Sequence, residues 1–157
     1  MREKSHLPET EAELNAILEK YGGKSANRRV IKINPRNARA WNNRGRARSD
    51  QGDLAAAIAD LDQAIKLDSR IVVVWSNSCS AHYLQGALDA ALADCNQALK
   101  LDARNVNAWS VRGLALQDKG DLEGALADFD HAITLYPQQR KNSASARRKI
   151  FKFSGTK

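Results

Sequence analysis

AIADLDQAI, the stretch Ala57–Ile65, occurs three times in related form in this chain of 157 residues. It returns as ALADCNQAL at Ala91–Leu99 and as ALADFDHAI at Ala125–Ile133, each copy beginning 34 residues after the one before. The tryptophans and one set of glycines follow the same interval: Trp41, Trp75 and Trp109, and Gly52, Gly86 and Gly120. A fixed period of this length is typical of a solenoid, in which each repeat is a small structural unit stacked on the next.

Each copy is predicted to form two helices joined at the glycine. In the third copy the apolar residues after the glycine fall on one helical face: Leu122, Ala125, Leu126, Phe129, Ala132 and Ile133. The glycine suits a left-handed turn that ends the first helix. Asp53 and Asp121 are predicted to cap the second helix, and Asn37 and Asn105 the first. Because one helix pair cannot bury its apolar face alone, the copies are expected to share a continuous core.

The repeat resembles the tetratricopeptide repeat, a 34-residue helical hairpin with an early Trp, a Gly four residues later and two spaced alanines in the second helix. The first copy matches at Trp41, Gly45, Ala57, Leu61 and Ala64, and the third at Trp109, Gly113, Ala125, Phe129, Ala132 and Pro137. The middle copy departs from the pattern, since Cys79 replaces the glycine and Cys95 the large apolar residue. The resemblance implies an all-α fold, a right-handed superhelical α-solenoid of antiparallel helix pairs.

The phase of the repeat predicts the domain organisation. We expect a degenerate N-terminal helix pair at 1–37, three repeats at 38–71, 72–105 and 106–139, and a basic C-terminal capping helix and tail at 140–157. In the N-terminal pair, Pro8–Tyr21 is predicted as a helix, followed by a short second helix that ends near Asn34. Atypical terminal repeats are expected because the outer face of a stack must be soluble.

The net charge of +7 is concentrated at the C-terminal end of the chain. Residues 140–157 hold seven Lys or Arg and no acidic residue, while residues 38–139 are mildly acidic. Ala146, Ile150 and Phe153 predict a narrow apolar stripe on a helix that caps the last repeat. The alternatives are contact of this helix with nucleic acid or an anionic membrane, or docking into a partner, through its cations Arg147, Arg148, Lys149 and Lys152.

The sequence supports neither membrane insertion nor catalysis. No apolar run reaches the roughly 18–20 residues of a membrane span, and Met1–Leu14 lacks the apolar core of a signal peptide, so we expect a cytoplasmic protein. The histidines His6, His82 and His131 lie far apart without metal-ligand spacing, and no phosphate loop or nucleophile motif occurs. We therefore expect no enzyme activity, metal or cofactor, and a solvated His131.

Two further features of the copies have structural interpretations. Cys79 and Cys95 are the only cysteines. We expect buried reduced thiols, with a disulfide as the alternative if the geometry allows it. Asp60, Asp94 and Asp128 share one repeat position, and we expect a solvated stripe rather than a cation site.

The start of the middle copy, Ile71–Val74, is β-branched and on its own would indicate a strand. The phase of Trp75 instead places it at the start of a helix, and stacking can outweigh a propensity deficit of a few tenths of a kcal/mol per residue. This copy lacks a polar cap at Ile71 and has Ala87 where its neighbours have Asp. We therefore expect it to be the least stable repeat locally.

The resemblance implies that the first helices line a concave groove and that residues flanking each Trp face it. The predicted groove residues are Arg39, Asn42, Asn43, Arg46, Val73, Asn77, Ser80, Tyr83, Leu84, Asn107, Val111 and Leu114. The first copy is basic and amide-rich, whereas the other two offer apolar side chains. Arginines pair with carboxylates, and asparagine amides bind a peptide backbone without reading its sequence. We therefore expect a peptide ligand that is acidic towards one end and apolar towards the other.

The predicted function is a non-catalytic protein–protein interaction module, a scaffold or adaptor that binds a peptide or protein segment in the groove. The alternatives are binding of nucleic acid or anionic membrane by the basic C-terminal helix, and a self-assembling structural scaffold, a homo-oligomer. Members of the family that bind chaperone tails use a clamp of Lys, Asn, Asn, Lys and Arg. Only Asn77 matches it here, because the other positions hold Asn42, Arg46, Asn107 and Val111. We therefore expect no chaperone-tail clamp.

Overall fold

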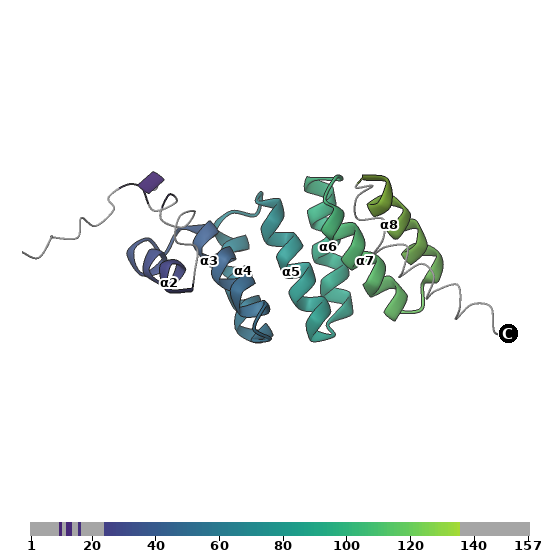
Figure 1. Ribbon diagram of the computed structural model, residues 1–157, viewed down its shortest axis with the longest axis horizontal. Helices are drawn as coiled ribbons and strands as arrows, with labels where there is room; N and C mark the ends of the chain where they lie inside the picture. The colour runs from purple at the N-terminus through teal and green to yellow at the C-terminus, as the bar shows by residue number, and fades with distance from the viewer. Residues whose placement is uncertain (1–9, 11, 14–15, 17–23, 136–157) are drawn as a thin grey trace, which may run out of the picture. The chain divides into compact units, whose positions relative to one another are not determined.

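The computed structural model describes residues 10, 12, 13, 16 and 24–135. Over this part the chain forms helices and no strand: α2 (Lys24–Ile33), α3 (Ala38–Ser49), α4 (Leu54–Leu67), α5 (Val72–Gln85), α6 (Leu88–Leu101), α7 (Val106–Asp118) and α8 (Leu122–Leu135) (Figure 1). The predicted all-α solenoid of helix pairs is confirmed. The helix predicted at Pro8–Tyr21 and the basic helix predicted within 140–157 lie outside the described residues.

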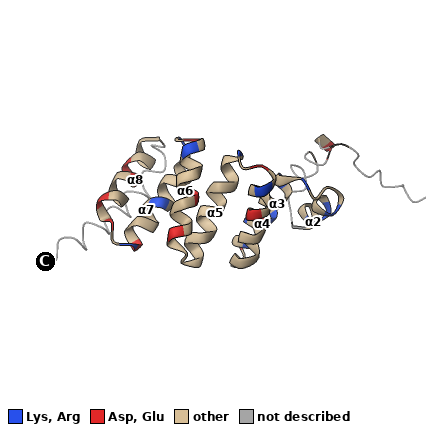
Figure 2. Ribbon diagram, turned by 180° about the vertical axis from the view of Figure 1, so that it is seen from behind, with Lys and Arg blue, Asp and Glu red and all other residues tan. Residues whose placement is uncertain are grey.

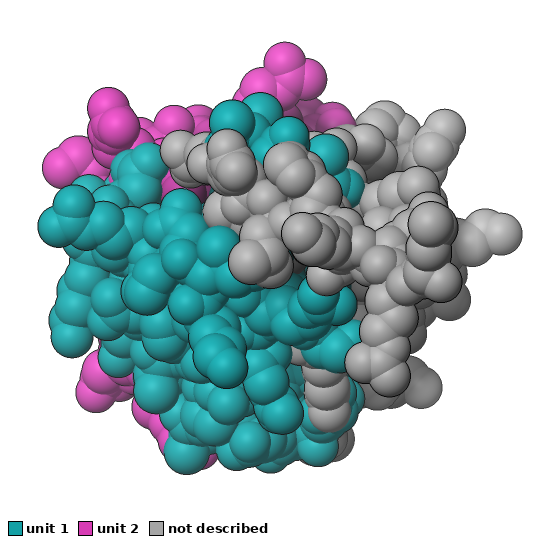
Figure 3. Space-filling view, turned by 90° about the vertical axis from the view of Figure 1, so that its left-hand side faces the viewer, with its two compact units in different colours: residues 1–69 teal, residues 70–157 magenta. Residues whose placement is uncertain are grey.

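The chain divides into two compact units, residues 1–69 and 70–157 (Figure 3). In the first unit α2 packs on α3, and α3 packs on α4. In the second unit α5 pairs with α6 and α7 with α8. The two pairs are joined because α7 packs against α6 and also lies beside α5. The second unit is therefore a stack of two whole repeats, with the first helices of both side by side.

The helix starts follow the predicted capping in part. The side chains of Asn37 and Asn105 each accept a 2.9 Å hydrogen bond from the backbone N–H three residues later. The middle copy, as predicted, has no side-chain cap at Ile71, yet α5 begins at Val72 and the β-branched run is helical. The second helix of that copy also begins without a side-chain cap, at Ala87.

Asp121 caps its helix as predicted, but Asp53 does not. The Asp121 carboxylate accepts a 2.9 Å hydrogen bond from the N–H of Gly124. A Cβ on Gly124 would lie 2.5 Å from that carboxylate. The first copy has Ala56 at the position of Gly124, and its Asp53 makes no side-chain hydrogen bond to the start of α4. The prediction for Asp53 was therefore wrong.

Two of the tryptophans tie their repeats to the loop before them. Trp41 Nε1 donates to the carbonyl of Pro35, and Trp109 Nε1 to that of Ala103, both at 2.8 Å. Three residues further on, the guanidinium groups of Arg44 and Arg112 lie over the indole rings at 4.7 and 4.6 Å from the centroids. Trp41 and Trp109 therefore each fix the start of a first helix by the ring nitrogen and by the ring face.

Two of the three periodic aspartates are buried and Asp94 is half-buried, contrary to the solvated stripe expected from the sequence. Asp60 and Asp128 are 2% and 3% exposed. Asp60 accepts 2.7 Å hydrogen bonds from Nε and Nη2 of Arg44 and a third, of 2.8 Å, from Arg48. The hydrogen bond to Asp60 is the main reason that the pKa of Arg44 is raised above its ordinary value. The aspartates face inward because each second helix turns this position towards the cations of its first helix.

The middle copy holds its aspartate differently. Asp94 accepts a 2.6 Å hydrogen bond from the Ser78 hydroxyl and lies 2.8 Å from His82 Nδ1. Ser78 stands at the repeat position of the arginines Arg44 and Arg112. The middle copy thus replaces a two-point arginine pair by a hydroxyl and an imidazole.

The two cysteines are joined by a disulfide, contrary to the reduced thiols expected from the sequence. Their Cα atoms are 5.2 Å apart, which lies within the range that a disulfide spans. In the third copy the same pair of positions holds Gly113 and Phe129, and a Cβ on Gly113 would lie 2.7 Å from the Phe129 ring. This contact draws the helices of a pair close together, so two cysteines placed there can reach one another.

Candidate peptide-binding surface

The first unit presents a basic row on α3. Arg39, Asn43 and Arg46 lie at helical positions i, i+4 and i+7, and so share one face. Both arginines are exposed and Asn43 is half-buried, while Asn42 is buried and donates to Asn43 Oδ1 at 3.3 Å. This row is chemically distinct from the opposite face, whose arginines are paired with Asp60. Arg39 and Arg46 are therefore placed to meet an acidic ligand.

The second unit presents an apolar and amide row on α5. Val73 and Leu84 are the most exposed large apolar residues of the described chain, at 49% and 60%. They lie eleven residues apart, which puts them on one face of the helix, with the half-buried Asn77 and Ser80 between them. Most surface helices expose charged residues on such a face. This row is therefore suited to contact with another molecule.

A polar seam joins α5 to α7. Asn107 donates through Nδ2 to the Ser76 and Ser80 hydroxyls at 2.9 and 3.2 Å. At the other end, burial raises the pKa of Tyr83 above its ordinary value, and a hydrogen bond to Asp118 adds to the rise. Asn107, Ser80 and Tyr83, all predicted groove residues, thus bind neighbouring helices to one another as well as facing outward.

The two remaining predicted residues belong mainly to the core. Val111 is buried and packs with the disulfide of Cys79 and Cys95, against which Tyr83 also packs. Leu114 is half-buried and packs against the cluster of Ala125 and Phe129. Little of Val111 reaches solvent, so its direct contact with a ligand would be small.

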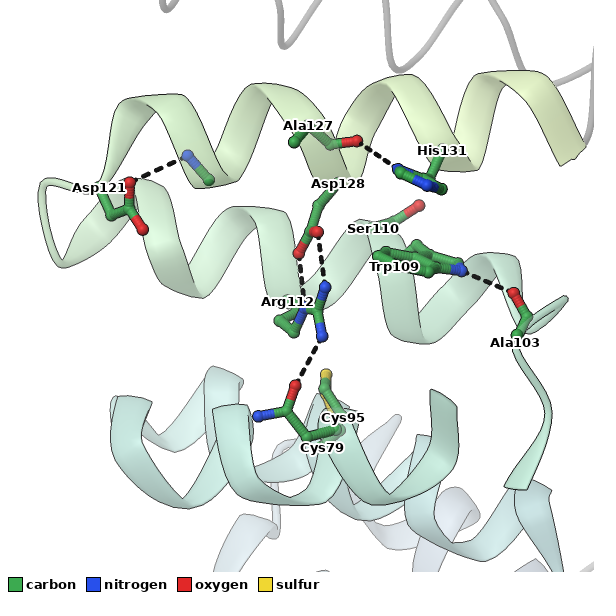
Figure 4. A network of polar contacts seen from close by, with 12 residues as sticks. Cys79, Cys95, Ala103, Trp109, Ser110, Arg112, Asp121, Ala127, Asp128 and His131 are labelled. Atoms are coloured by element: carbon green, nitrogen blue, oxygen red, sulfur yellow. Dashed lines mark hydrogen bonds and ion pairs between the residues drawn. A yellow bond between two sulfur atoms is a disulfide. The ribbon is translucent and has the colours of Figure 1, made fainter. Parts of the chain in front are cut away.

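Sequence reasoning missed the polar groups that hold each helix pair together. Arg112 donates to Asp128 on α8 and, at 2.6 Å, to Asn96 on α6, so that one side chain joins two repeats (Figure 4). The signal was present, because Arg44 and Arg112 share the 34-residue phase and each precedes its aspartate by 16 residues. His131, expected to be solvated, is exposed and stacks on Trp109 with 4.4 Å between the ring centroids.

The repeats match known families directly. Models of the tetratricopeptide repeat match residues 38–70 and 106–139, and a further model described as a TPR repeat matches residues 80–120. Together these matches cover more than half of the chain. The chain belongs to the tetratricopeptide repeat family.

Solved structures of other tetratricopeptide repeat domains share the fold. A TPR domain of OM64 from Arabidopsis is 28% identical, with a TM-score of 0.70 over 73% of this chain and 94% of that one. The first TPR domain of Spaghetti (RPAP3), bound to the HSP90 peptide SRMEEVD, is 26% identical, with a TM-score of 0.71 over 76% and 94%. The second TPR domain of human RPAP3, in complex with the HSP70 peptide SGPTIEEVD, is 27% identical, with a TM-score of 0.66 over 70% and 91%.

These matches identify the tetratricopeptide repeats of this chain as a protein–protein interaction module. Among proteins of curated function, none matches the sequence. No helix within the described residues is long and apolar enough to cross a membrane. The same residues contain no group of three or more His, Cys, Asp or Glu side chains that could hold a metal ion.

Proposed function

We propose that this protein is a scaffold or adaptor that binds protein segments on the first helices of its repeats. In the first unit, Arg39 and Arg46 on α3 would meet acidic residues, and in the second unit, Val73 and Leu84 on α5 would meet apolar residues. The observation that carries the proposal is the exposed row on α5, where two large apolar side chains flank Asn77 and Ser80. An asparagine amide both donates to and accepts from a peptide backbone, so such a row offers a ligand backbone and side-chain contacts together.

Two similar structures support a ligand of this composition. The peptides in the titles of the RPAP3 complexes, SRMEEVD and SGPTIEEVD, both combine an apolar residue with adjacent acidic residues. This chain differs from the clamp of the chaperone-binding members, because Asn107 and Val111 replace the last two cations of that clamp and Val111 is buried. We therefore propose an acidic and apolar segment as the ligand class without a requirement for a terminal carboxylate.

The test compares matched surface variants of the full chain in a capture experiment from the native host. The row variants are Leu84→Asp and Arg46→Glu. The control variants are Leu101→Asp and Lys100→Glu, which change exposed residues of α6 by the same chemistry. Loss of the same captured protein with both row variants, but with neither control, supports the proposal.

Retention of that protein by both row variants overturns the proposal. A chain ending at Gln139 separates the remaining alternative, because loss of capture only on truncation would assign binding to residues 140–157. In that case nucleic acid or lipid among the captured material would identify the ligand, and binding should fall steeply with salt.

A further inference from the structure

The two helices of the middle repeat pack against each other through different residues from those used in the neighbouring repeats. In the flanking repeats, Gly45 faces Leu61 and Gly113 faces Phe129, and an added Cβ would lie 2.9 and 2.7 Å from those side chains. One helix therefore contributes a large side chain and the other contributes none. In the middle repeat Cys79 stands in the glycine position and Cys95 in the large one. Each position therefore contributes one small side chain to the contact between the helices, and the two sulfurs are bonded to each other.

The disulfide links α5 to α6, and it also affects how the neighbouring side chains pack. Two unbonded heavy atoms pack at about 3.5–4.0 Å, far beyond the length of a covalent bond. Cys79 and Cys95 are both fully buried, so reduction would move the two sulfurs apart inside the packed helix pair. The neighbours that must yield are Val111 and Tyr83, which pack against the pair.

These neighbours belong to the face that we assign to ligand binding. Tyr83 lies one residue before the exposed Leu84 and packs against the cysteine pair and Val111. Val111 also lies on α7. A change at the disulfide therefore reaches both first helices of the second unit, where the α5 row lies.

We propose that the Cys79–Cys95 disulfide is a redox-controlled clamp on the α5–α7 face, closed in the oxidised protein and opened by a dithiol reductant. With the bond closed, α5 is held on α6 and Tyr83 and Val111 keep their positions. With the bond open, the helix pair loosens and the face loses its order. The effect on ligand affinity rests on the function proposed above, whereas the loosening of the helix pair does not.

The exchange reaction balances with a dithiol alone. A thiolate of the reductant attacks one sulfur, forming a mixed disulfide and releasing the other cysteine as a thiolate, which takes up a proton. The second thiol of the reductant then displaces the first cysteine. Two electrons and two protons pass to the protein, and the reductant leaves as a cyclic disulfide.

The middle repeat also has the local weakness that such an opening needs. Because both cysteines are fully buried, a reductant reaches them only when the helix pair opens locally. Both helices of this pair start without a side-chain cap, at Ile71 and Ala87. A missing cap lowers the stability of a helix start. Among the three described repeats, this is the one in which both helices start without a side-chain cap, and it is also the one that holds the cross-link.

The test is hydrogen exchange of the full chain, oxidised and treated with dithiothreitol, with thiols counted in the native state. The control variant combines Cys79→Gly with Cys95→Leu, which reproduces the packing of Gly45 and Leu61 and cannot respond to the reductant. In the natural chain, dithiothreitol should release two thiols and speed exchange in α5 and α7 by about tenfold or more. The control should not change.

Equal exchange in both redox states, or release of thiols only after global unfolding, would overturn the clamp. A second experiment measures binding of the peptide SRMEEVD to the oxidised and reduced proteins. It separates the proposed clamp from the proposed ligand-binding function. Binding that falls on reduction of the natural chain, but not of the control, supports the link to the face, and binding that is equal in both states refutes that link. If neither protein binds the probe or any captured segment, the proposed function fails, while the exchange result still decides the clamp.

Discussion

Arg112 on α7 holds Asp128 on α8 through two parallel hydrogen bonds, from Nε and from Nη2, each 2.7 Å long. The carboxylate side chain is only 4% exposed and the guanidinium 21%. Arg44 and Asp60 repeat this geometry in the first unit. The helix pairs are therefore joined by charge as well as by apolar packing.

We expect Arg112→Ala to lower the free energy of unfolding by on the order of 3 kcal/mol, because it leaves the Asp128 charge buried without a partner. Replacing both residues together, as in Arg112→Leu with Asp128→Leu, should cost much less. Urea denaturation of the three proteins measures this. If the double variant is no more stable than the single one, the pair is not a coupled buried charge pair.

Gly113→Ala should destabilise the protein by about 1–3 kcal/mol, since its Cβ would lie 2.7 Å from the Phe129 ring. Phe129→Leu on the same chain should restore part of the loss, because it removes ring atoms that the added Cβ would meet. A double-mutant cycle of thermal unfolding gives the coupling between the two positions. Strict additivity would show that the clash is relieved elsewhere.

The raised pKa of Tyr83 predicts that the folded protein loses stability in alkaline solution. Burial and the hydrogen bond to Asp118 raise its pKa in the folded state above the ordinary value of 10.0. A raised folded pKa means that the folded state binds the proton more tightly, so this contribution is complete below the unfolded pKa and is lost as pH rises through the folded pKa.

Denaturation at about pH 9 and about pH 11 should therefore show a smaller alkaline loss for Tyr83→Phe than for the natural chain. Ultraviolet titration of tyrosinate should show one late-ionising group that the variant lacks. Identical pH profiles of the two proteins would mean that folding does not raise the pKa of Tyr83.

The peptide SRMEEVD should bind this chain with little dependence on its terminal carboxylate. Asn107 and the buried Val111 stand where a clamp would place cations, so amidation of the peptide should change its Kd by less than about threefold. Fluorescence anisotropy with labelled free-acid and amide peptides measures the difference. A loss of tenfold or more on amidation would show that other cations grip the carboxylate.

The sequence predicts the helices better than it predicts what their polar residues do. The phase of Trp75 correctly placed a β-branched run at the start of α5, because stacking outweighs local propensity. Asn37 and Asn105 cap as expected, since their partners are local. In contrast, the periodicity of Asp60 and Asp128 shows that they share a face but not whether that face looks inward.

At the candidate site, too, some features could be predicted from the sequence and others could not. The exposure of Arg39, Arg46 and Leu84 agrees with their predicted place on outward faces. The burial of Val111 was not predicted, because it comes from packing against the cysteine pair of another repeat. The pairing distance itself could have been inferred, since the same two positions bring Gly113 against Phe129 in the third copy.

The backward reach of the indole hydrogen bonds has a consequence for where the repeats can be cut and rejoined. Trp109 is anchored to the carbonyl of Ala103, which precedes its own helix and closes the repeat before it. A junction placed between Ala103 and Val106 would separate the ring from its anchor, even though the helices on both sides stayed whole. Chimeric arrays built from this chain should therefore be spliced within a second helix, so that each Trp travels together with the loop that it fastens.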